Sequence, residues 1–263
     1  MGIKKRGLVL IMNALKKYLP LIGTILLAGC GSPLSFESGQ PVPPPSPTPL
    51  VRLPAVGQEW SYIQRDMFQG QEIGVLLERV NSVGAYVVIG RTMTSTLPKQ
   101  SLLSDIALGH TTRENGQLAN EVQGPWGEVL ADPSWGKVLE FSPGIPLWPS
   151  NLGNPQPQTF NVRYSIPGGF ASNLRWSSRM KVFGWEKIAV PAGQFIALHY
   201  ENQIVYTSPN FSKTDCERRE NLWFVPSVGR WVAKETSGSC MQPEQTNDPN
   251  LQASYRWELS SWK

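Results

Sequence analysis

Apolar and polar residues alternate along several short runs of this chain. In RWSSRMKVFGW (175–185), Trp176, Met180 and Val182 fall on one side of an extended backbone, and the charged residues fall on the other. The same pattern recurs in EWSYI (59–63), QFIALHYENQIVY (194–206) and SYRWELSSW (254–262). Successive side chains of a β-strand point to opposite faces, so a period of two residues indicates strands that bury one face.

Turn-forming residues separate these runs. VPAG (190–193) has proline second and glycine fourth, as in a β-turn, and Asn115-Gly116 is a typical hairpin turn. About ten strand-like runs follow one another at the spacing typical of antiparallel sheets that close on themselves. We therefore expect a mainly β fold, an antiparallel sheet curved into a barrel or half-barrel. At most one or two short helices are expected, and Ser101–Leu108 is the candidate.

The N-terminus has the organisation of an export signal. From Met12, Lys16 and Lys17 precede the apolar stretch Leu19–Leu27, and small residues follow. A secretory signal combines a basic start with an apolar stretch of roughly 7–15 residues, and this spacing predicts that translation begins at Met12 rather than at Met1. A membrane-spanning anchor is the alternative, but a span needs about 20 apolar residues and this stretch is too short.

Leu27-Ala28-Gly29-Cys30 ends this segment and resembles the lipobox of bacterial lipoproteins. The resemblance implies removal of a signal peptide (1–29) by cleavage between Gly29 and Cys30, and acylation of Cys30 with chains such as palmitate. One acyl chain binds a membrane weakly, so two or three make a durable anchor. Gly31 and Ser32 follow, without the aspartate that retains many such lipoproteins at the inner membrane. The outer membrane, at its periplasmic face, is therefore implied, and the inner membrane stays open as the alternative.

Residues 30–56 form a proline-rich segment with eight prolines between Pro33 and Pro54. Proline-rich chains are extended, at about 3.1 Å per residue. We therefore expect a linker that holds a β-rich periplasmic domain (57–263) away from the lipid. A recognition segment, PPPSPTP (43–49), is the alternative.

The basic character of the chain belongs to its N-terminus. The whole sequence has 24 Lys and Arg against 20 Asp and Glu, a net charge of +4. Residues 1–29 contain five of the basic residues and no acidic one, which leaves 19 against 20, or −1, for the rest. Because nucleic-acid-binding domains carry a basic patch, this balance argues against a nucleic-acid partner.

Cys216 and Cys240 are the only cysteines beyond the lipobox. They lie equally far from Val228, in the turn PSVG (226–229) of a predicted hairpin, and meet across its two arms if the register is regular. A bulge near this turn would shift the pairing by one residue. Exported proteins retain disulfides, so a structural disulfide is expected. Reduced thiols or a metal site are the alternatives, but two cysteines with two histidines are a poor zinc set, and no metal or cofactor is expected.

Two longer segments resemble a pattern shared by uncharacterised exported bacterial proteins. GWEKIAVPAGQFIALHYE (184–201) precedes LWFVPSVGRWVAKE (222–235), the start GQEWSYI (57–63) also matches, and Phe224 stands where tyrosine is commoner. The resemblance implies an antiparallel β-fold, a curved sheet around an apolar cavity. It brings no catalytic residues.

The sequence contains no recognisable motif of an active site. A G-x-S-x-G elbow, a phosphate loop and a dinucleotide fingerprint are all absent. His110 is expected in a loop and His199 in an exposed position or a cross-strand contact, and no spacing pairs either with a partner for general-base catalysis. The carboxylates are scattered one per segment, at Asp66, Glu78, Asp105, Asp132 and Glu186. We expect no catalysis, and a hydrolase whose carboxylates converge in the fold stays as an alternative.

Trp126 and Trp135 begin two similar segments, WGEVL (126–130) and WGKVL (135–139). Two tryptophans on one loop would stack on sugar rings, which makes them candidate ligand or glycan contacts. The alternative is that both rings plug the end of a barrel, and the large area that tryptophan buries favours it.

These observations predict an outer-membrane-anchored lipoprotein with a non-catalytic binding or scaffolding β-domain. In one hypothesis the domain holds a lipid-like ligand, which an apolar concave face with few charges would support. In the other it docks onto peptidoglycan, another glycan or an envelope protein complex, which exposure of Trp126 and Trp135 would support.

Overall fold

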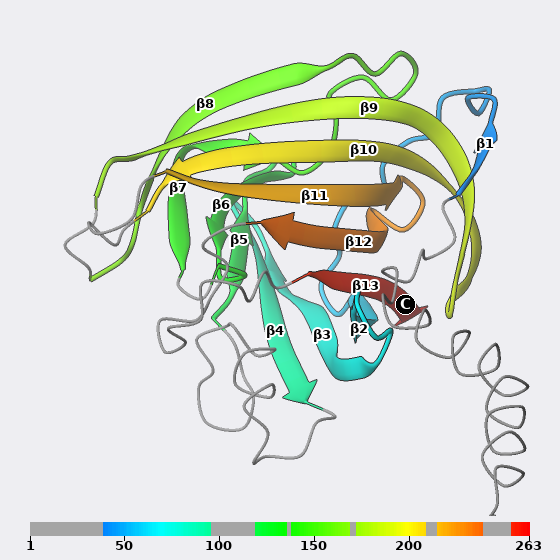
Figure 1. The fold of residues 1–263 in the computed structure, drawn as a ribbon, viewed down its shortest axis with the longest axis horizontal. Coiled ribbons are helices and arrows are strands. Elements are labelled where there is room, and N and C mark those ends of the chain that lie inside the picture. Colours follow the sequence, from blue (N-terminus) through cyan, green and yellow to red (C-terminus); the bar gives the residue numbers. More distant parts are fainter. Residues whose placement is uncertain (1–38, 96–118, 136–137, 169–171, 209–214, 239–253) are drawn as a thin grey trace, which may run out of the picture. The chain divides into compact units, whose positions relative to one another are not determined.

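The computed structural model describes residues 39–95, 119–135, 138–168, 172–208, 215–238 and 254–263 (Figure 1). All of them belong to the second of two units into which the chain divides, Ser35–Lys263. The strands are β1 (Gln40–Val42), β2 (Glu59–Asp66), β3 (Glu72–Val83), β4 (Val87–Ser95), β5 (Glu121–Gln123), β6 (Glu128–Asp132), β7 (Leu139–Pro146), β8 (Gln158–Ser165), β9 (Leu174–Val190), β10 (Gly193–Thr207), β11 (Asp215–Val225), β12 (Arg230–Gly238) and β13 (Tyr255–Trp262). These ranges contain no helix, and therefore none that could cross a membrane. The helix candidate Ser101–Leu108 lies outside them.

Strands β2 to β13 form a closed antiparallel barrel of twelve strands. Each pairs with the next along the chain, and the pairing of β13 with β2 completes the circle. Figure 1 shows β9 to β12 as long curved strands lying side by side. The thirteenth strand, β1, pairs with β9 beside the part that β8 does not reach. This confirms the predicted β-barrel, and closure removes the exposed strand edges that an open sheet would present.

The alternation predicted the buried face correctly in most strands. Trp176 and Met180 of β9 are buried, whereas Arg179, which points to the opposite face of the strand, is exposed. In β10, Leu198 and Tyr200 are buried as expected, but Ile196 on the same face is half exposed.

The connections alternate between the two ends of the barrel because neighbouring strands are antiparallel. One end, called the strap end below, carries the connections 84–86, 124–127, 147–157, 191–192 and 226–229 together with the segment 43–58 from β1 to β2. Backbone hydrogen bonds join Arg52 N to Pro226 O at 2.8 Å and Ala192 N to Leu259 O at 2.9 Å. These contacts hold the connections together over that end of the barrel.

Residues 39–58 differ from the extended linker expected for residues 30–56. β1 lies in the sheet, with Pro41 opposite Glu186 of β9, and a proline is tolerated there because an edge strand can do without its N–H donor. Val42 and Val51 pack against the core of the barrel. The folded domain therefore begins by residue 39, and the segment 43–58, called the strap below, crosses the barrel end.

Two clusters of buried apolar side chains fill the barrel. The larger includes Trp60, Tyr62, Leu198 and Phe224. The smaller surrounds Trp176, whose ring lies 4.7–5.9 Å from the rings of its aromatic neighbours, Trp135, Phe141, Tyr164 and Tyr206. The described interior is therefore a packed core with no wide channel.

Gly229, the last residue of the β11–β12 turn, allows the strap to approach. Its φ is +73°, and a Cβ there would lie 2.5 Å from the carbonyl oxygen of Arg52. We expect Gly229→Ala to lower the free energy of unfolding by about 1–3 kcal/mol, because a left-handed backbone and a backbone clash combine. Urea denaturation measures it. Gly84→Ala is the control, because a Cβ at Gly84 meets nothing within 4 Å, and an equal loss in both variants would contradict the explanation.

The β11–β12 hairpin contains a bulge near its turn, and a bulge there shifts the pairing of the two arms by one residue. Phe224 pairs with Trp231, but Trp223 pairs with Ala233, so Val232 is the extra residue. Beyond it the register is regular as far as Arg218 and Gly238.

The described register, bulge included, agrees with the spacing of the two cysteines in the sequence. Two residues beyond the pair Arg218–Gly238, the same register leads to Cys216 and to position 240. Cys216 is buried in the smaller apolar cluster, and Cys240 lies outside the described residues. The Cys216–Cys240 disulfide stays a prediction, which the register supports.

Candidate functional site

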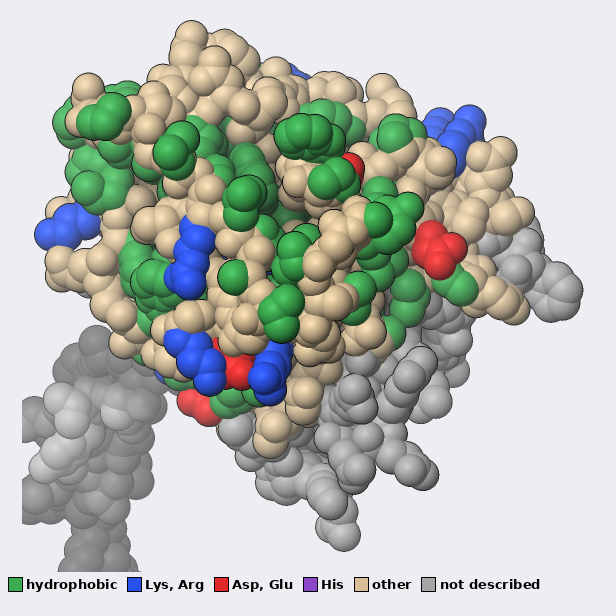
Figure 2. Space-filling view, turned by 180° about the vertical axis from the view of Figure 1, so that it is seen from behind, with side chains coloured by type: hydrophobic (Ala, Val, Ile, Leu, Met, Phe, Trp, Pro, Cys, Tyr) green, Lys and Arg blue, Asp and Glu red, His purple; other side chains and the backbone are tan. Residues whose placement is uncertain are grey.

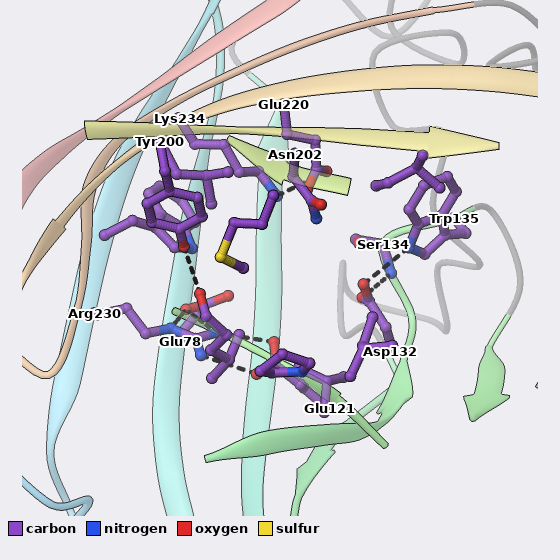
Figure 3. A pocket seen from close by; sticks show the side chains of 18 of the residues that line it. Glu78, Glu121, Asp132, Ser134, Trp135, Tyr200, Asn202, Glu220, Arg230 and Lys234 are labelled. Atoms are coloured by element: carbon purple, nitrogen blue, oxygen red, sulfur yellow. Dashed lines mark hydrogen bonds and ion pairs between the residues drawn. The ribbon is translucent and has the colours of Figure 1, made fainter. Parts of the chain in front are cut away.

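A small cavity lies inside the barrel between the two apolar clusters (Figure 3). Its volume is about 70 Å³, and strands β3–β7 and β9–β12 supply its walls. Its polar and charged lining residues are Glu78, Arg91, Glu121, Asp132, Ser134, Asn202, Glu220, Arg230 and Lys234. Burial of a charge is costly without a partner, so the pairing of these groups determines what the site can do.

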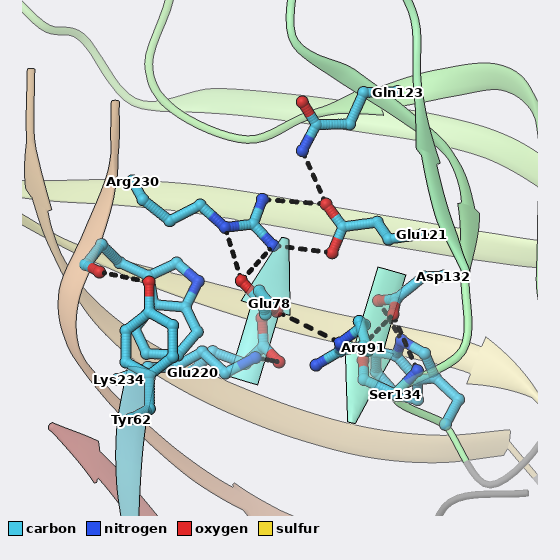
Figure 4. A network of polar contacts seen from close by, with 12 residues as sticks. Tyr62, Glu78, Arg91, Glu121, Gln123, Asp132, Ser134, Glu220, Arg230 and Lys234 are labelled. Atoms are coloured by element: carbon cyan, nitrogen blue, oxygen red, sulfur yellow. Dashed lines mark hydrogen bonds and ion pairs between the residues drawn. The ribbon is translucent and has the colours of Figure 1, made fainter. Parts of the chain in front are cut away.

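Arg230 joins carboxylates from two other strands (Figure 4). Its Nε donates to Glu78 Oε2 at 2.9 Å, and its Nη1 and Nη2 donate to Oε1 and Oε2 of Glu121, each at 2.9 Å. Gln123 Nε2 also donates to Glu121 Oε1, at 2.6 Å. Arg230 is 3% exposed and Glu78 is 0% exposed. Two-pronged pairing of this kind is among the strongest polar contacts in proteins.

The local sequence directs these side chains into the barrel. Glu78 lies between the buried Leu76 and Val80 of β3, and so shares their inward phase. Arg91 likewise lies between the buried Ile89 and Met93 of β4. In both strands a charged residue replaces an apolar one at a core position, so its partners must come from other strands.

Arg91 is paired less completely than Arg230. Its Nε lies 3.1 Å from Glu78 Oε1 and its Nη1 lies 3.7 Å from Asp132 Oδ1, but neither nitrogen has a hydrogen bond although both are buried. Asp132 also accepts hydrogen bonds from Ser134 N at 2.8 Å and from Trp135 Nε1 at 2.9 Å. Arg91 therefore has two N–H groups beside the cavity, on Nε and Nη1, that make no hydrogen bond.

A second charged group lies on the β11–β12 side of the interior. Glu220 Oε1 lies 2.7 Å from Arg218 Nη2 and 3.8 Å from Lys234 Nζ. The Arg218 guanidinium also covers the ring of Trp135, 4.0 Å from its centroid. Over both groups, Arg91, Arg218, Arg230 and Lys234 balance Glu78, Glu121, Asp132 and Glu220.

Burial and pairing shift several pKa values in this interior. Desolvation alone would raise the pKa of Glu121, but the Arg230 guanidinium and its hydrogen bonds outweigh it and lower the pKa. The pKa of Asp132 is lowered in the same way, against desolvation, by Arg91 and by Ser134. Desolvation lowers the pKa of Lys234, and it raises that of Tyr62.

Glu121 and Asp132 make the folding stability depend on pH. Their folded pKa values lie below the unfolded ones of about 4.3 and 3.9, so their contribution is complete above those values and is lost as the pH falls through the folded pKa. We expect the free energy of unfolding, measured in urea at a series of pH values, to fall below about pH 4.5. The fall should be shallower in Glu121→Gln, whereas Glu217→Gln, at an exposed position of β11, should keep the wild-type slope. Identical slopes in Glu121→Gln and wild type would contradict the assignment.

The carboxylates of the interior do converge, as the hydrolase alternative required, but each forms ion pairs with arginine or lysine side chains. A glycosidase needs one carboxyl group with a raised pKa to act as general acid, whereas the pKa values of Glu121 and Asp132 are lowered. A cavity of about 150 Å³ is needed to hold benzene, and this one is about half that size. The described cavity therefore suits a few water molecules better than a sugar or an acyl chain.

The same cavity does not match the apolar interior that the family resemblance implied. Binding of a lipid-like ligand would be supported by a concave apolar face with few charges. The described cavity is lined by charged side chains as well as apolar ones, and most apolar side chains of the interior pack against one another in the two clusters.

His199 makes a cross-strand contact on the face of β10 opposite Tyr200, one of the two placements that the alternation suggested. Its Nδ1 lies 2.9 Å from Glu186 Oε1, and its ring stacks on Trp223 with centroids 4.4 Å apart. Trp223 Nε1 donates to the other oxygen of the same carboxylate at 2.8 Å. His110 lies outside the described residues.

Trp126 and Trp135 lie at opposite ends of the barrel, so they cannot form one platform. Trp126 is in the β5–β6 turn at the strap end and is 86% exposed. Trp135 follows β6 at the other end and packs on Trp176 and Tyr206, with ring centroids 4.7 and 5.4 Å away. Trp135 therefore packs against the interior of the barrel, whereas Trp126 is exposed.

The sequence interpretation missed most of the interior charges. Of the scattered carboxylates it named, Glu78 and Asp132 belong to the network, but Glu121, Arg230 and Lys234 were not identified. A detectable signal existed for Glu78 and Arg91, because each is a charge in the apolar phase of a strand. No such signal exists for Glu121, which lies in a strand of three residues.

Comparisons with known proteins match this chain to solved structures at low identity. No protein-family model matches the chain, and no curated protein does. An inferred lipoprotein from Parabacteroides distasonis is 16% identical, with 80% of this chain and 96% of that chain covered and a TM-score of 0.44. An inferred exported protein with a YmcC-like fold from Bacteroides fragilis is 14% identical (82% and 99% covered, TM-score 0.43). The hypothetical lipoprotein YmcC from Escherichia coli is 13% identical (78% and 84% covered, TM-score 0.40).

Proposed function

We propose that this protein is a lipid-anchored protein of the bacterial outer membrane whose β-barrel acts through its outer surface, without catalysis. Cys30 carries the lipid after removal of residues 1–29. The partners are the membrane itself and an envelope component, a protein complex or peptidoglycan, that the barrel contacts from outside. The observation that carries the proposal is the packed interior of the barrel.

The packed interior supports a surface function because the part of the barrel that the structure describes leaves no room for a bulky ligand. Apolar side chains fill both clusters, and the charges between them are paired across strands. The cavity of about 70 Å³ is lined by Trp135 and by Tyr200, whose hydroxyl donates to Leu147 O, among others. A carrier of lipid-like molecules would need a larger and apolar space.

The position of the folded domain supports a close tether. The domain begins by residue 39, so only residues 31–38 separate it from Cys30. An extended chain spans at most about 3.3–3.6 Å per residue, so these residues reach no further than about 30 Å. The lipid therefore holds the barrel near the membrane surface, closer than a linker as far as residue 56 would.

Native mass spectrometry of the full-length protein, extracted from membranes in detergent, tests this function. The expected species is the chain from Cys30 with its acyl groups, two hydrogens lighter if Cys216 and Cys240 are joined, and with nothing else bound. The Cys30→Ala variant should lack the acyl mass. It should also no longer be found in the outer-membrane fraction. A second molecule released only on denaturation would overturn the surface function in favour of a carrier.

A further inference from the structure

We propose that the strap end of the barrel is a membrane-docking surface, which lies against the lipid headgroups of the leaflet that holds the anchor. This inference rests on the proposed lipid anchor and adds to it the orientation of the barrel. Three observations carry it: the lack of charge at this end, the exposure of its apolar side chains, and the point where the tether leaves the domain.

The connections at the strap end are almost free of charge. In the segments 43–58, 84–86, 124–127, 147–157, 191–192 and 226–229, Arg52 is the only charged residue, and no carboxylate side chain occurs. Lys263, which follows β13 at the same end, adds a second cation; its side chain is 70% exposed and pairs with Glu59 Oε2 at 2.7 Å. Connections without an acidic residue do not repel a surface that carries anionic lipid headgroups.

Large apolar side chains are exposed at this end. On the strap, Leu50 is 90% exposed and Leu53 is 74% exposed, and Trp126 in the neighbouring β5–β6 turn is 86% exposed. The other exposed apolar residues of this end are Val56, Val83, Tyr86 and Trp262. Figure 2 shows one face of the molecule, on which hydrophobic side chains lie among uncharged atoms and charges form a few small groups. Tryptophan and tyrosine favour the membrane–water interface, where the ring is buried and its polar group stays hydrated.

The tether leaves the domain at the same end. β1 is antiparallel to β9, with Gln40 opposite Lys187, three residues before β9 ends at Val190. The chain therefore enters β1 from the strap end, and the short tether from Cys30 reaches the barrel there. A tether of this length brings the strap end to the bilayer before any other part of the barrel, so its exposed apolar residues meet lipid.

Fluorescence quenching by brominated lipids tests the orientation. The acylated full-length protein is reconstituted into vesicles of phosphatidylethanolamine and phosphatidylglycerol, with and without bromine on the acyl chains. We expect brominated lipid to quench tryptophan emission, and Trp126→Phe to lose the largest share of that quenching. Leu53→Glu should also reduce it, because a carboxylate on the strap opposes insertion.

The matched control is at the other end of the barrel. Phe68, in the β2–β3 turn, is 59% exposed, so Phe68→Trp in the Trp126→Phe background places an exposed indole away from the membrane, and no quenching should return. Equal quenching of wild type and Trp126→Phe, or recovery in Phe68→Trp, would overturn the docking surface.

Flotation of the same vesicles separates this inference from the proposed function. If the protein floats but Trp126 is not quenched, the proposed anchor holds and the docking surface is overturned. If the protein carries no acyl group but still floats and is quenched at Trp126, the anchor is overturned and the docking surface holds.

Discussion

Arg230→Met is expected to lower the free energy of unfolding by about 3–5 kcal/mol, because it removes one partner from a buried charge network. The guanidinium of Arg230 makes hydrogen bonds to both Glu78 and Glu121, and neither carboxylate can move into water from inside the barrel. A methionine of similar length fills the space but leaves two buried carboxylates without their main cation. Urea denaturation at neutral pH measures the loss.

Two comparisons make this prediction specific to burial. Arg219→Met removes an ion pair with Glu217 whose side chains are 56% and 55% exposed, and we expect a loss of about 0–1 kcal/mol. The quadruple variant Glu78→Leu/Arg91→Met/Glu121→Leu/Arg230→Met removes two buried charges of each sign together, and it should recover part of the stability. Equal losses for Arg230→Met and Arg219→Met would show that the interior network does not stabilise the fold.

Trp176→Ala is expected to lower the free energy of unfolding by about 3–5 kcal/mol, because it leaves a cavity at the centre of the smaller apolar cluster. Trp176 is completely buried, and its ring touches four other aromatic rings, those of Trp135, Phe141, Tyr164 and Tyr206. Loss of the indole also removes a packing partner of the Trp135 ring, which lines the cavity. Thermal unfolding followed by circular dichroism measures the change.

Trp126→Ala is the matched control for this second substitution. Its side chain is 86% exposed, so we expect a change within about 0.5 kcal/mol. Trp176→Phe should fall between the two, since it keeps an aromatic ring in the cluster. A loss for Trp126→Ala as large as that for Trp176→Ala would contradict the burial that separates the two tryptophans.

The strands and their buried faces were predictable because alternation is a local property. Trp60, Tyr62, Trp176 and Met180 are buried as their phase indicated. The linker was predicted wrongly in part, because proline content indicates an extended chain but not whether that chain packs. Residues 40–42 are extended, as expected, and they lie in the sheet because β9 is long enough to offer them a free edge.

The candidate site was much less predictable than the fold. Glu78 and Arg91 could be recognised as charges at core positions, but their partners could not. Trp126 and Trp135 look like a pair in sequence, nine residues apart, yet the five-residue strand β6 between them sends them to opposite ends. Two similar segments of sequence thus place their tryptophans in different environments, because antiparallel connections alternate between the two ends of a barrel.

The sequence by itself determined the β class of this protein, the inward face of its strands and the position of its main turns, because these follow from the geometry of a short extended chain. Only the tertiary structure decided that the sheet closes, that Arg230 meets Glu78 and Glu121 from 152 and 109 residues away, and that the strap crosses one end of the barrel. Such contacts depend on which strands are neighbours and on their register, and no local pattern of residues specifies either.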